Sequence, residues 1–292
     1  MAESCQEITP VERGSAAYPP LLRQIPDAPQ RLYVRGRIEA LQATLPLAVV
    51  GTRAMTNYGE RVTRLLAPPL AAAGATIVSG LALGIDAAAH EAALAARGTT
   101  VAVLGGGVDD ASIGPRANFG LARRILQDGG ALVSEYPPGT SGQKHHFPAR
   151  NRIIAGLSKG LLVIEAAAKS GALLTAQLGL DYNRDVFAVP GPITQTASAG
   201  ANRLLQQGAT PVTGPQDILD RYGIAIPPEN PLNMPADPDA AAVLKRLNHE
   251  PQDFDGLTET TGLPAPRLLA ALTALELSGA ARKTGRGFIL YR

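Results

Sequence analysis

The chain has 292 residues, of which 45% are apolar and 18% are charged, with 27 Lys and Arg against 25 Asp and Glu. This size can bury one core and a small second domain, and the near-balance of charge excludes a protein that is basic overall, so a polyanion site must be local. One cysteine, Cys5, excludes an internal disulfide, and four histidines without HExxH or CxxC spacing predict no metal site. The polar start MAESCQEI and short apolar runs predict a cytoplasmic protein.

The first two regions in chain order predict an α/β domain. Residues 1–43 carry proline and turn signals without a domain of their own, and we expect them to pack on the core that follows. Within 44–223, the runs PLAVVG, ATIVSG, TTVAVLG, ALVSEY, GLLVIE and DVFAVPG alternate with amphipathic stretches. Continuous rather than alternating hydrophobicity indicates strands buried on both faces. The sequence therefore predicts a Rossmann-like parallel sheet, whose ligands bind beyond the carboxyl ends of its strands.

The remaining sequence predicts a linker and a second domain. The proline-rich residues 224–237 favour an extended spacer. Residues 238–292 read as three helices and a β-hairpin, the order of a winged helix-turn-helix domain. The third predicted helix has Arg267 as its only basic residue, so it has few side chains that could bind base edges in the major groove of duplex DNA. A protein-contact role and weak double-stranded DNA binding through the wing both remain open.

Two strand-end loops have features of phosphate sites. Arg53 follows the first predicted strand and stands where a dinucleotide fingerprint requires glycine, so we expect no NAD and no other cofactor. After the second strand, Ser79 and Gly80 lie in a turn whose backbone N–H groups could approach a phosphate. Ser79, Asp86 and His90 also suggest a hydrolase triad, but no G-x-S-x-G turn is present, so helix capping and packing is the preferred reading.

A basic segment, QKHHFPARNR, lies between the fourth predicted strand and a helix. It surrounds Phe147 with Lys144, Arg150 and Arg152, and it contains no acid. An aromatic ring among cations can hold a base and its phosphates without reading sequence, at ~1–3 kcal/mol for each stacked base. Asn151 could cap the helix or contact phosphate. The alternative is that Phe147 belongs to the core and the arginines form a solvated helix face.

Two further loops carry weaker signals. Ser170 is expected to cap the helix that follows the fifth strand, and Lys169 adds positive charge at the anion-attracting end of that helix. A plain cap with a solvated lysine is the alternative. The glycines 105–107 after the third strand fit a ligand turn and a flexible crossover equally well.

Several motifs resemble the DprA/Smf family, whose members are DNA-processing proteins. The resemblance spans about residues 18–222 and rests on VGTRAMTNYG, SGLALGIDAAAHEAAL, FPARNRIIAGLSKGLLVIEAAAKSGALLTAQLGLDYNRDVFAVPG and SAGANRLLQQGA. It implies a non-enzymatic homodimer that binds and protects single-stranded DNA during natural transformation, displaces single-strand-binding protein and loads RecA recombinase. By resemblance, the DNA-binding residues are Arg53, Ser79, Gly80, Lys144, Phe147, Arg150, Asn151 and Arg152, with Lys169 and, from its helix cap, Ser170 as further candidates.

The chain departs from the family pattern, and one enzyme alternative remains. Gly114 precedes Pro115 where the family usually has Tyr-Pro, and the N-terminal region is too short for the complete helical domain of many members. The alternative is a Rossmann-like nucleotide phosphoribohydrolase that holds a nucleoside monophosphate at the same edge. Such an enzyme needs a P-G-G-x-G-T-x-x-E turn, whereas KSGALLTAQ ends in Gln177. Glu135 and Glu165 are the acids placed to serve, and strand-end packing explains them more simply.

Overall fold

The computed structural model describes residues 7–225, 235, 237–248 and 250–290, and it divides the chain into two compact units. The larger unit is Met1–Ile226 and the smaller is Pro227–Arg292. Cys5 and most of the predicted linker 224–237 lie outside the described residues. Within the described part of the chain, no helix has both the length and the apolar composition needed to cross a bilayer.

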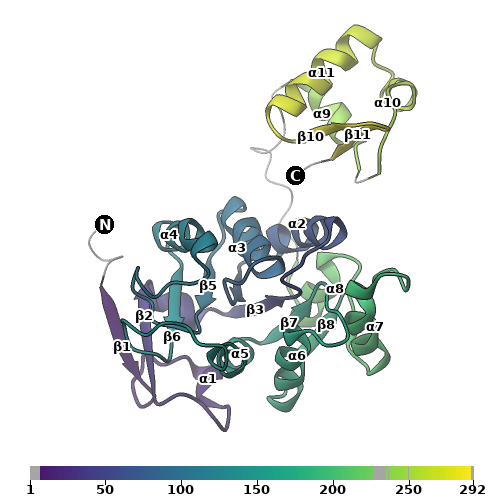
Figure 1. Cartoon of the computed structure of the whole chain (residues 1–292). Helices are drawn as coiled ribbons and strands as arrows, with labels where there is room; N and C mark the ends of the chain where they lie inside the picture. Colours follow the sequence, from purple (N-terminus) through teal and green to yellow (C-terminus); the bar gives the residue numbers. More distant parts are fainter. Residues whose placement is uncertain (1–6, 226–234, 236, 249, 291–292) are drawn as a thin grey trace. The chain divides into compact units, whose positions relative to one another are not determined.

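The larger unit is built on one sheet with the strand order β1-β2-β6-β5-β4-β3-β7-β8-β9 (Figure 1). The strands are β1 (Ile8–Glu12), β2 (Arg31–Gly36), β3 (Leu45–Val50), β4 (Ala75–Ser79), β5 (Thr100–Val103), β6 (Ala131–Ser134), β7 (Gly160–Val163), β8 (Asp185–Ala188) and β9 (Thr210–Pro211). The strands from β6 to β9 are parallel, whereas β2 pairs antiparallel with β6 and with β1. The Rossmann-like prediction is confirmed.

Helices cover both faces of this sheet (Figure 1). They are α1 (Pro20–Arg23), α2 (Asn57–Ala72), α3 (Ile85–Ala95), α4 (Phe119–Gln127), α5 (His146–Leu157), α6 (Gly171–Asp181), α7 (Ala199–Gln206) and α8 (Pro215–Leu219), with 3-10 turns at Ile38–Gln42, Arg116–Asn118, Thr196–Ser198 and Asp220–Tyr222. In β3, Ala48 and Val50 pack with α5 and α6, while Leu47 and Val49 pack with α2 and α3. Both faces of β3 are therefore buried, which explains its unbroken apolar sequence.

The N-terminal residues of the larger unit extend its sheet as well as packing on it. In β2, Tyr33 pairs with Ser134 and Gly36 with Ala131 of β6, and β1 adds to the outer side of β2. Leu22 is fully buried, and the Tyr18 hydroxyl donates a 2.7 Å hydrogen bond to the Pro29 carbonyl. The sequence predicts that residues 1–43 pack on the core, but it does not predict the strands β1 and β2.

The smaller unit has the predicted winged helix order. It comprises α9 (Pro238–Leu244), α10 (Phe254–Thr261), α11 (Ala265–Leu277), β10 (Ala281–Thr284) and β11 (Gly287–Leu290), with β10 and β11 antiparallel. Val243, Leu257, Leu268, Leu272 and Phe288 belong to its own apolar core. A separate core of this kind is what a small independent domain requires.

Candidate nucleic-acid interface

The predicted loops meet at one edge of the sheet because they follow neighbouring parallel strands. Arg53 follows β3, Ser79 and Gly80 stand at the end of β4, Gly105 follows β5, and Lys169 follows β7. The segment that carries Lys144 and Phe147 enters α5 from the end of β6. This edge is where open α/β sheets bind ligands.

Phe147 and Arg53 form the centre of this edge. The guanidinium carbon of Arg53 lies 5.5 Å from the centroid of the half-buried Phe147 ring. The ring rests on Gly105, where a Cβ atom would come within 3.0 Å of it, and His146 Nδ1 lies 2.9 Å from the Gly105 carbonyl oxygen. The backbone below thus fixes an aromatic ring beside an exposed cation, which is a geometry suited to stacking a base next to a phosphate.

Two exposed lysines add charge to the same edge. Lys144 and Lys169 are exposed, as is Arg53, and the ion pairs found within the described residues use other side chains. Ser170 caps α6, since its Oγ accepts a 3.3 Å hydrogen bond from the Ala172 N–H. The three cations Arg53, Lys144 and Lys169 are therefore available to an anion, and a DNA contact at these residues stays a prediction.

The turn after β4 is already occupied by a carboxylate of the protein itself. The Gly80 N–H donates a 3.1 Å hydrogen bond to Oδ2 of Asp86, and the buried Ser79 hydroxyl donates to the Val49 carbonyl at 2.6 Å. Burial is the main influence on Asp86 and raises its pKa, against the opposing charge of Arg150. The Ser79 hydroxyl and the Gly80 N–H thus already bond within the protein, and the phosphate contacts expected at these residues stay predictions.

Arg150 lies beneath the loops rather than on their surface. Arg150 is only 4% exposed. Its Nη1 donates one hydrogen bond to the Gly80 carbonyl, at 2.6 Å, and another to the Val103 carbonyl. Burial lowers its pKa to about 10. The Arg150 guanidinium thus ties the ends of β4 and β5 together, and its predicted contact with phosphate stays a prediction.

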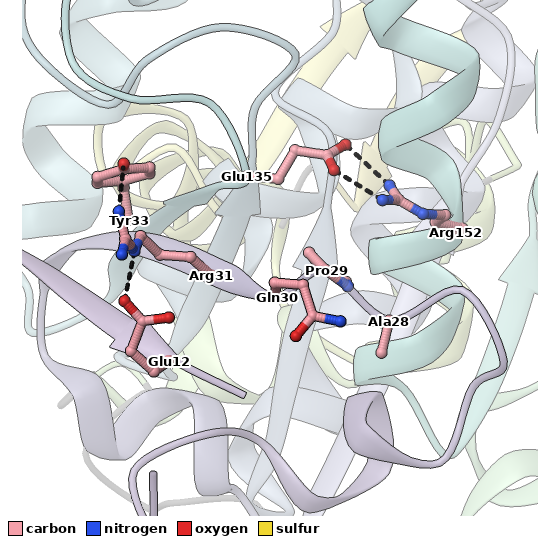
Figure 2. A pocket seen from close by; sticks show the side chains of 8 residues that line it. All are labelled: Glu12, Ala28, Pro29, Gln30, Arg31, Tyr33, Glu135 and Arg152. Atoms are coloured by element: carbon pink, nitrogen blue, oxygen red, sulfur yellow. Dashed lines mark hydrogen bonds and ion pairs between the residues drawn. The ribbon is translucent and has the colours of Figure 1, made fainter. Parts of the chain in front are cut away.

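Arg152 is held by acids on the far side of α5. It makes two hydrogen bonds to the Glu135 carboxylate, at 2.6 and 2.8 Å, and Nε donates to the Asp27 carbonyl at 3.0 Å. These bonds to Glu135 raise the pKa of Arg152. Figure 2 shows this pair on the wall of a pocket of about 550 Å³ that Arg31 and Tyr33 also line. The charge of Arg152 is therefore compensated by Glu135. Asn151 beside it is half-buried, and the phosphate contacts predicted for Asn151 and Arg152 stay predictions.

The residues that suggested enzymes have other structural partners. His90 is fully buried with Nδ1 2.6 Å from Thr100 Oγ1, and burial lowers its pKa to about 3. The hydrogen-bond partner of His90 is Thr100 and not Ser79 or Asp86, so these three side chains do not form a catalytic relay. Glu165 is buried and accepts hydrogen bonds from the Thr56 N–H and hydroxyl at the start of α2. Among the described residues, no group of three or more His, Cys, Asp or Glu side chains could hold a metal ion.

The glycines after β5 serve close packing of backbone. A Cβ atom at Gly106 would lie 2.9 Å from the Thr140 carbonyl and from the Gly142 nitrogen, and the Gly107 N–H donates to Thr140 O at 2.8 Å. The sequence prediction offered a ligand turn or a flexible crossover at these glycines, and neither alternative included this close backbone packing. The sequence analysis also missed the ring of Tyr136, which stacks on His146 at 3.9 Å and thereby supports the start of α5. Two aromatic residues ten positions apart gave no signal of that stack.

Comparisons with known proteins agree along almost the whole chain. Residues 10–223 match the family model of DNA recombination-mediator protein A, and residues 227–285 match the DprA winged helix domain. Protein Smf of Escherichia coli K12 is 44% identical over 291 residues, covering 97% of this chain and 77% of that protein.

Two solved structures are similar to the larger part of the chain. The X-ray structure of DNA processing protein A from Streptococcus pneumoniae has a TM-score of 0.69 and 41% identity, covering 75% of this chain and 76% of that one. DNA processing protein A from Helicobacter pylori, studied for its single-stranded DNA binding mode, has a TM-score of 0.67 and 32% identity over 75% of this chain and 97% of that one.

Proposed function

Because the chain belongs to the DNA recombination-mediator protein A family, also called DprA or Smf, we propose that it binds single-stranded DNA at the carboxyl edge of its sheet. The observation that supports this most is the exposed Arg53 guanidinium beside the Phe147 ring. One base stacks on Phe147, while Arg53, Lys144 and Lys169 neutralise phosphates of the same strand. The Helicobacter pylori relative, whose structure concerns single-stranded DNA binding, supports this choice of ligand.

The contacts are independent of base sequence. A stacked ring and exposed cations recognise features that every nucleotide has, and the described groups that could read base edges at this turn, such as the Gly80 N–H, are bonded to Asp86. Affinity then depends on phosphate neutralisation and falls as salt rises. Ser79, Gly80 and Arg150 act in this scheme as supports that hold the loop in place.

The protein works by binding rather than by catalysis. It protects incoming single strands, displaces single-strand-binding protein and loads RecA recombinase during natural transformation and related recombination, in the cytoplasm. A homodimer would place two such edges on one strand and raise avidity without new contacts. The winged domain contributes at most weak duplex binding through its wing, because Arg267 on α11 is held by Asp239 through two hydrogen bonds of 2.6 Å.

Fluorescence anisotropy with labelled single-stranded and duplex oligonucleotides at several salt concentrations tests this proposal. The variants are Arg53→Ala, Phe147→Ala and, as a control, Arg123→Ala, which removes an exposed arginine from α4. We expect single-strand preference, a loss of affinity in the first two variants, and a salt dependence in Arg53→Ala that is shallower by about 0.7 in log–log slope.

Two outcomes would contradict the proposal. If Arg53→Ala and Arg123→Ala bound single-stranded DNA with equal affinity, the carboxyl edge of the sheet would not be the binding site. Absence of DNA binding, together with release of free base from nucleoside monophosphates, would favour the phosphoribohydrolase alternative, which the internal bonding of Glu135 and Glu165 does not support.

A further inference from the structure

Exposed apolar side chains occur on the same edge as the cations. Among the described residues of the larger unit, the large apolar side chains exposed to solvent are Leu65, Leu83, Leu174, Leu180 and Ile193. Leu83 lies in the loop after β4, and Ile193 lies in the loop after β8. Because β4 and β8 are parallel strands of one sheet, both loops belong to the carboxyl edge that carries Arg53.

Leu83 is held in an outward position next to the Arg53 loop. Its neighbour Gly84 has a φ of +80°, and a Cβ atom there would lie 2.4 Å from the Thr52 carbonyl oxygen. In the same loop, Leu81 is buried, and its carbonyl accepts a 2.8 Å hydrogen bond from the Asn118 side chain. With Leu81 inward and Gly84 packed against the Arg53 loop, Leu83 stays 48% exposed beside that arginine.

Ile193 is presented by a loop that is fastened at its base. The Asn202 side chain exchanges two hydrogen bonds with the Gly191 backbone, at 2.9 and 3.1 Å, and the Tyr58 hydroxyl donates to the Pro190 carbonyl at 2.6 Å. Ile193 itself is 94% exposed. The strand it follows, β8, neighbours β7, whose loop carries Lys169. Ile193 is thus an exposed side chain in the loop that neighbours the Lys169 loop at this edge of the sheet.

The order of the strands places these groups in a row. From β4 through β3 and β7 to β8, the edge carries Leu83, Arg53, Lys169 and Ile193, and the Phe147 ring lies 5.5 Å from the guanidinium carbon of Arg53. Neighbouring strands are about 4.8 Å apart, so the row from Leu83 to Ile193 extends roughly 14 Å. Cations bordered by apolar groups match a ligand that has charged phosphates and uncharged base faces along its length, whereas a purely electrostatic site would need only the cations.

We infer that Leu83 and Ile193 are base contacts, which extend the site on both sides of Arg53 along a single strand. At about 3.4 Å per stacked nucleotide, a 14 Å row corresponds to roughly four nucleotides. This inference rests on the proposed single-stranded DNA function and adds to it the length of the site and a second, uncharged kind of contact.

The test compares Leu83→Ser and Ile193→Ser with Leu180→Ser. Leu180 is a matched control, because it is 47% exposed but stands near the C-terminal end of α6. Anisotropy is measured with a labelled oligothymidine of about 12 nucleotides, a length that exceeds the expected site. We expect Leu83→Ser to weaken DNA binding about fivefold, because the bound strand then no longer buries about half of a leucine side chain. Leu180→Ser should leave the affinity unchanged.

Salt titration separates this inference from the function on which it rests. Leu83→Ser should keep the salt dependence of the wild type, whereas Arg53→Ala should make it shallower.

Three results have distinct meanings. Loss of affinity in Arg53→Ala with equal affinities of Leu83→Ser and Leu180→Ser would overturn the base contacts and leave the DNA function standing. Unchanged DNA affinity combined with a shift in sedimentation of Leu83→Ser would also overturn them, by assigning the apolar side chain to a protein interface. No binding of the wild type to the oligonucleotide would overturn the proposed function itself.

Discussion

Replacing Arg150 with methionine would show whether a buried cation holds the edge together. Methionine fills part of the same volume but cannot donate to the carbonyls of Gly80 and Val103, which both accept hydrogen bonds from Arg150 Nη1. It also removes the positive charge that opposes the desolvation of the buried Asp86. The variant therefore leaves two backbone acceptors without this donor, and one buried carboxylate without the nearby positive charge.

The expected cost follows from these three groups. A buried acceptor that loses its partner costs about 1–3 kcal/mol, and the loss of a nearby positive charge adds to the cost of burying the Asp86 carboxylate. These costs overlap at one site, so we expect Arg150→Met to lower the free energy of unfolding by roughly 3–5 kcal/mol. That is a large part of the ~5–15 kcal/mol typical of a domain.

Urea unfolding of a double-mutant cycle measures the charge term separately. Asp86→Asn keeps an acceptor for the Gly80 N–H but removes the negative charge. The double variant Asp86→Asn/Arg150→Met should therefore lose at least about 1 kcal/mol less free energy of unfolding than the sum of the losses of the two single variants. The control is Arg123→Met on exposed α4, expected to change stability by less than about 0.5 kcal/mol. Additive single variants, or a cost of Arg150→Met near that of Arg123→Met, would refute the reasoning.

Three further predictions concern other parts of the chain. Burial lowers the pKa of His90 from 6.5 to about 3, so the stability that depends on neutral His90 is complete above pH 6.5 and is lost as the pH falls toward 3. Between pH 7 and 5, urea unfolding should therefore show a loss of about 2 kcal/mol in the wild type that is absent in His90→Gln. An equal loss in His90→Gln would contradict this prediction. Gly80→Ala places a Cβ atom 2.3–2.5 Å from the Arg150 guanidinium and should destabilise by about 1–3 kcal/mol in thermal unfolding, whereas Gly120→Ala, with open space around it, should not. Arg267→Ala should leave duplex affinity unchanged in anisotropy because Asp239 already binds that guanidinium, and a large loss would show that α11 contacts DNA.

The central sheet could be predicted because its strands are buried on both faces. Each of the six apolar runs is a strand in the structure, from β3 to β8, since a strand covered on both sides leaves no polar positions to blur the pattern. The strands β1 and β2 lie at one side of the sheet, and in β2 buried and more exposed residues alternate over RLYVRG, so these strands lack the continuous apolar run by which β3 to β8 were found. The third missed strand, β9, has only two residues.

The composition of the candidate site was predictable, but the placement of its arginines depended on packing. Arg150 and Arg152 are two residues apart on α5, so they point to different sides of the helix. Arg150 precedes the buried Ile153 and Ile154 by three and four positions, the spacing of a shared helix face. That periodicity was the available signal for its burial. The pairing of Arg152 with Glu135 joins segments 17 residues apart and had no counterpart in the local sequence.

The antiparallel pairing of β2 with β6 has a consequence for synthesis on the ribosome. The paired residues Tyr33 and Ser134 are separated by roughly 100 positions, so β1 is the one sheet partner of β2 among the described strands until β6 has been made. At about 5–20 residues per second, the β1–β2 pair waits roughly 5–20 seconds with Leu22 and Leu32, fully buried in the folded protein, still exposed. The β1–β2 pair thus joins the sheet late, and during this interval its apolar residues are open to chaperones and proteases.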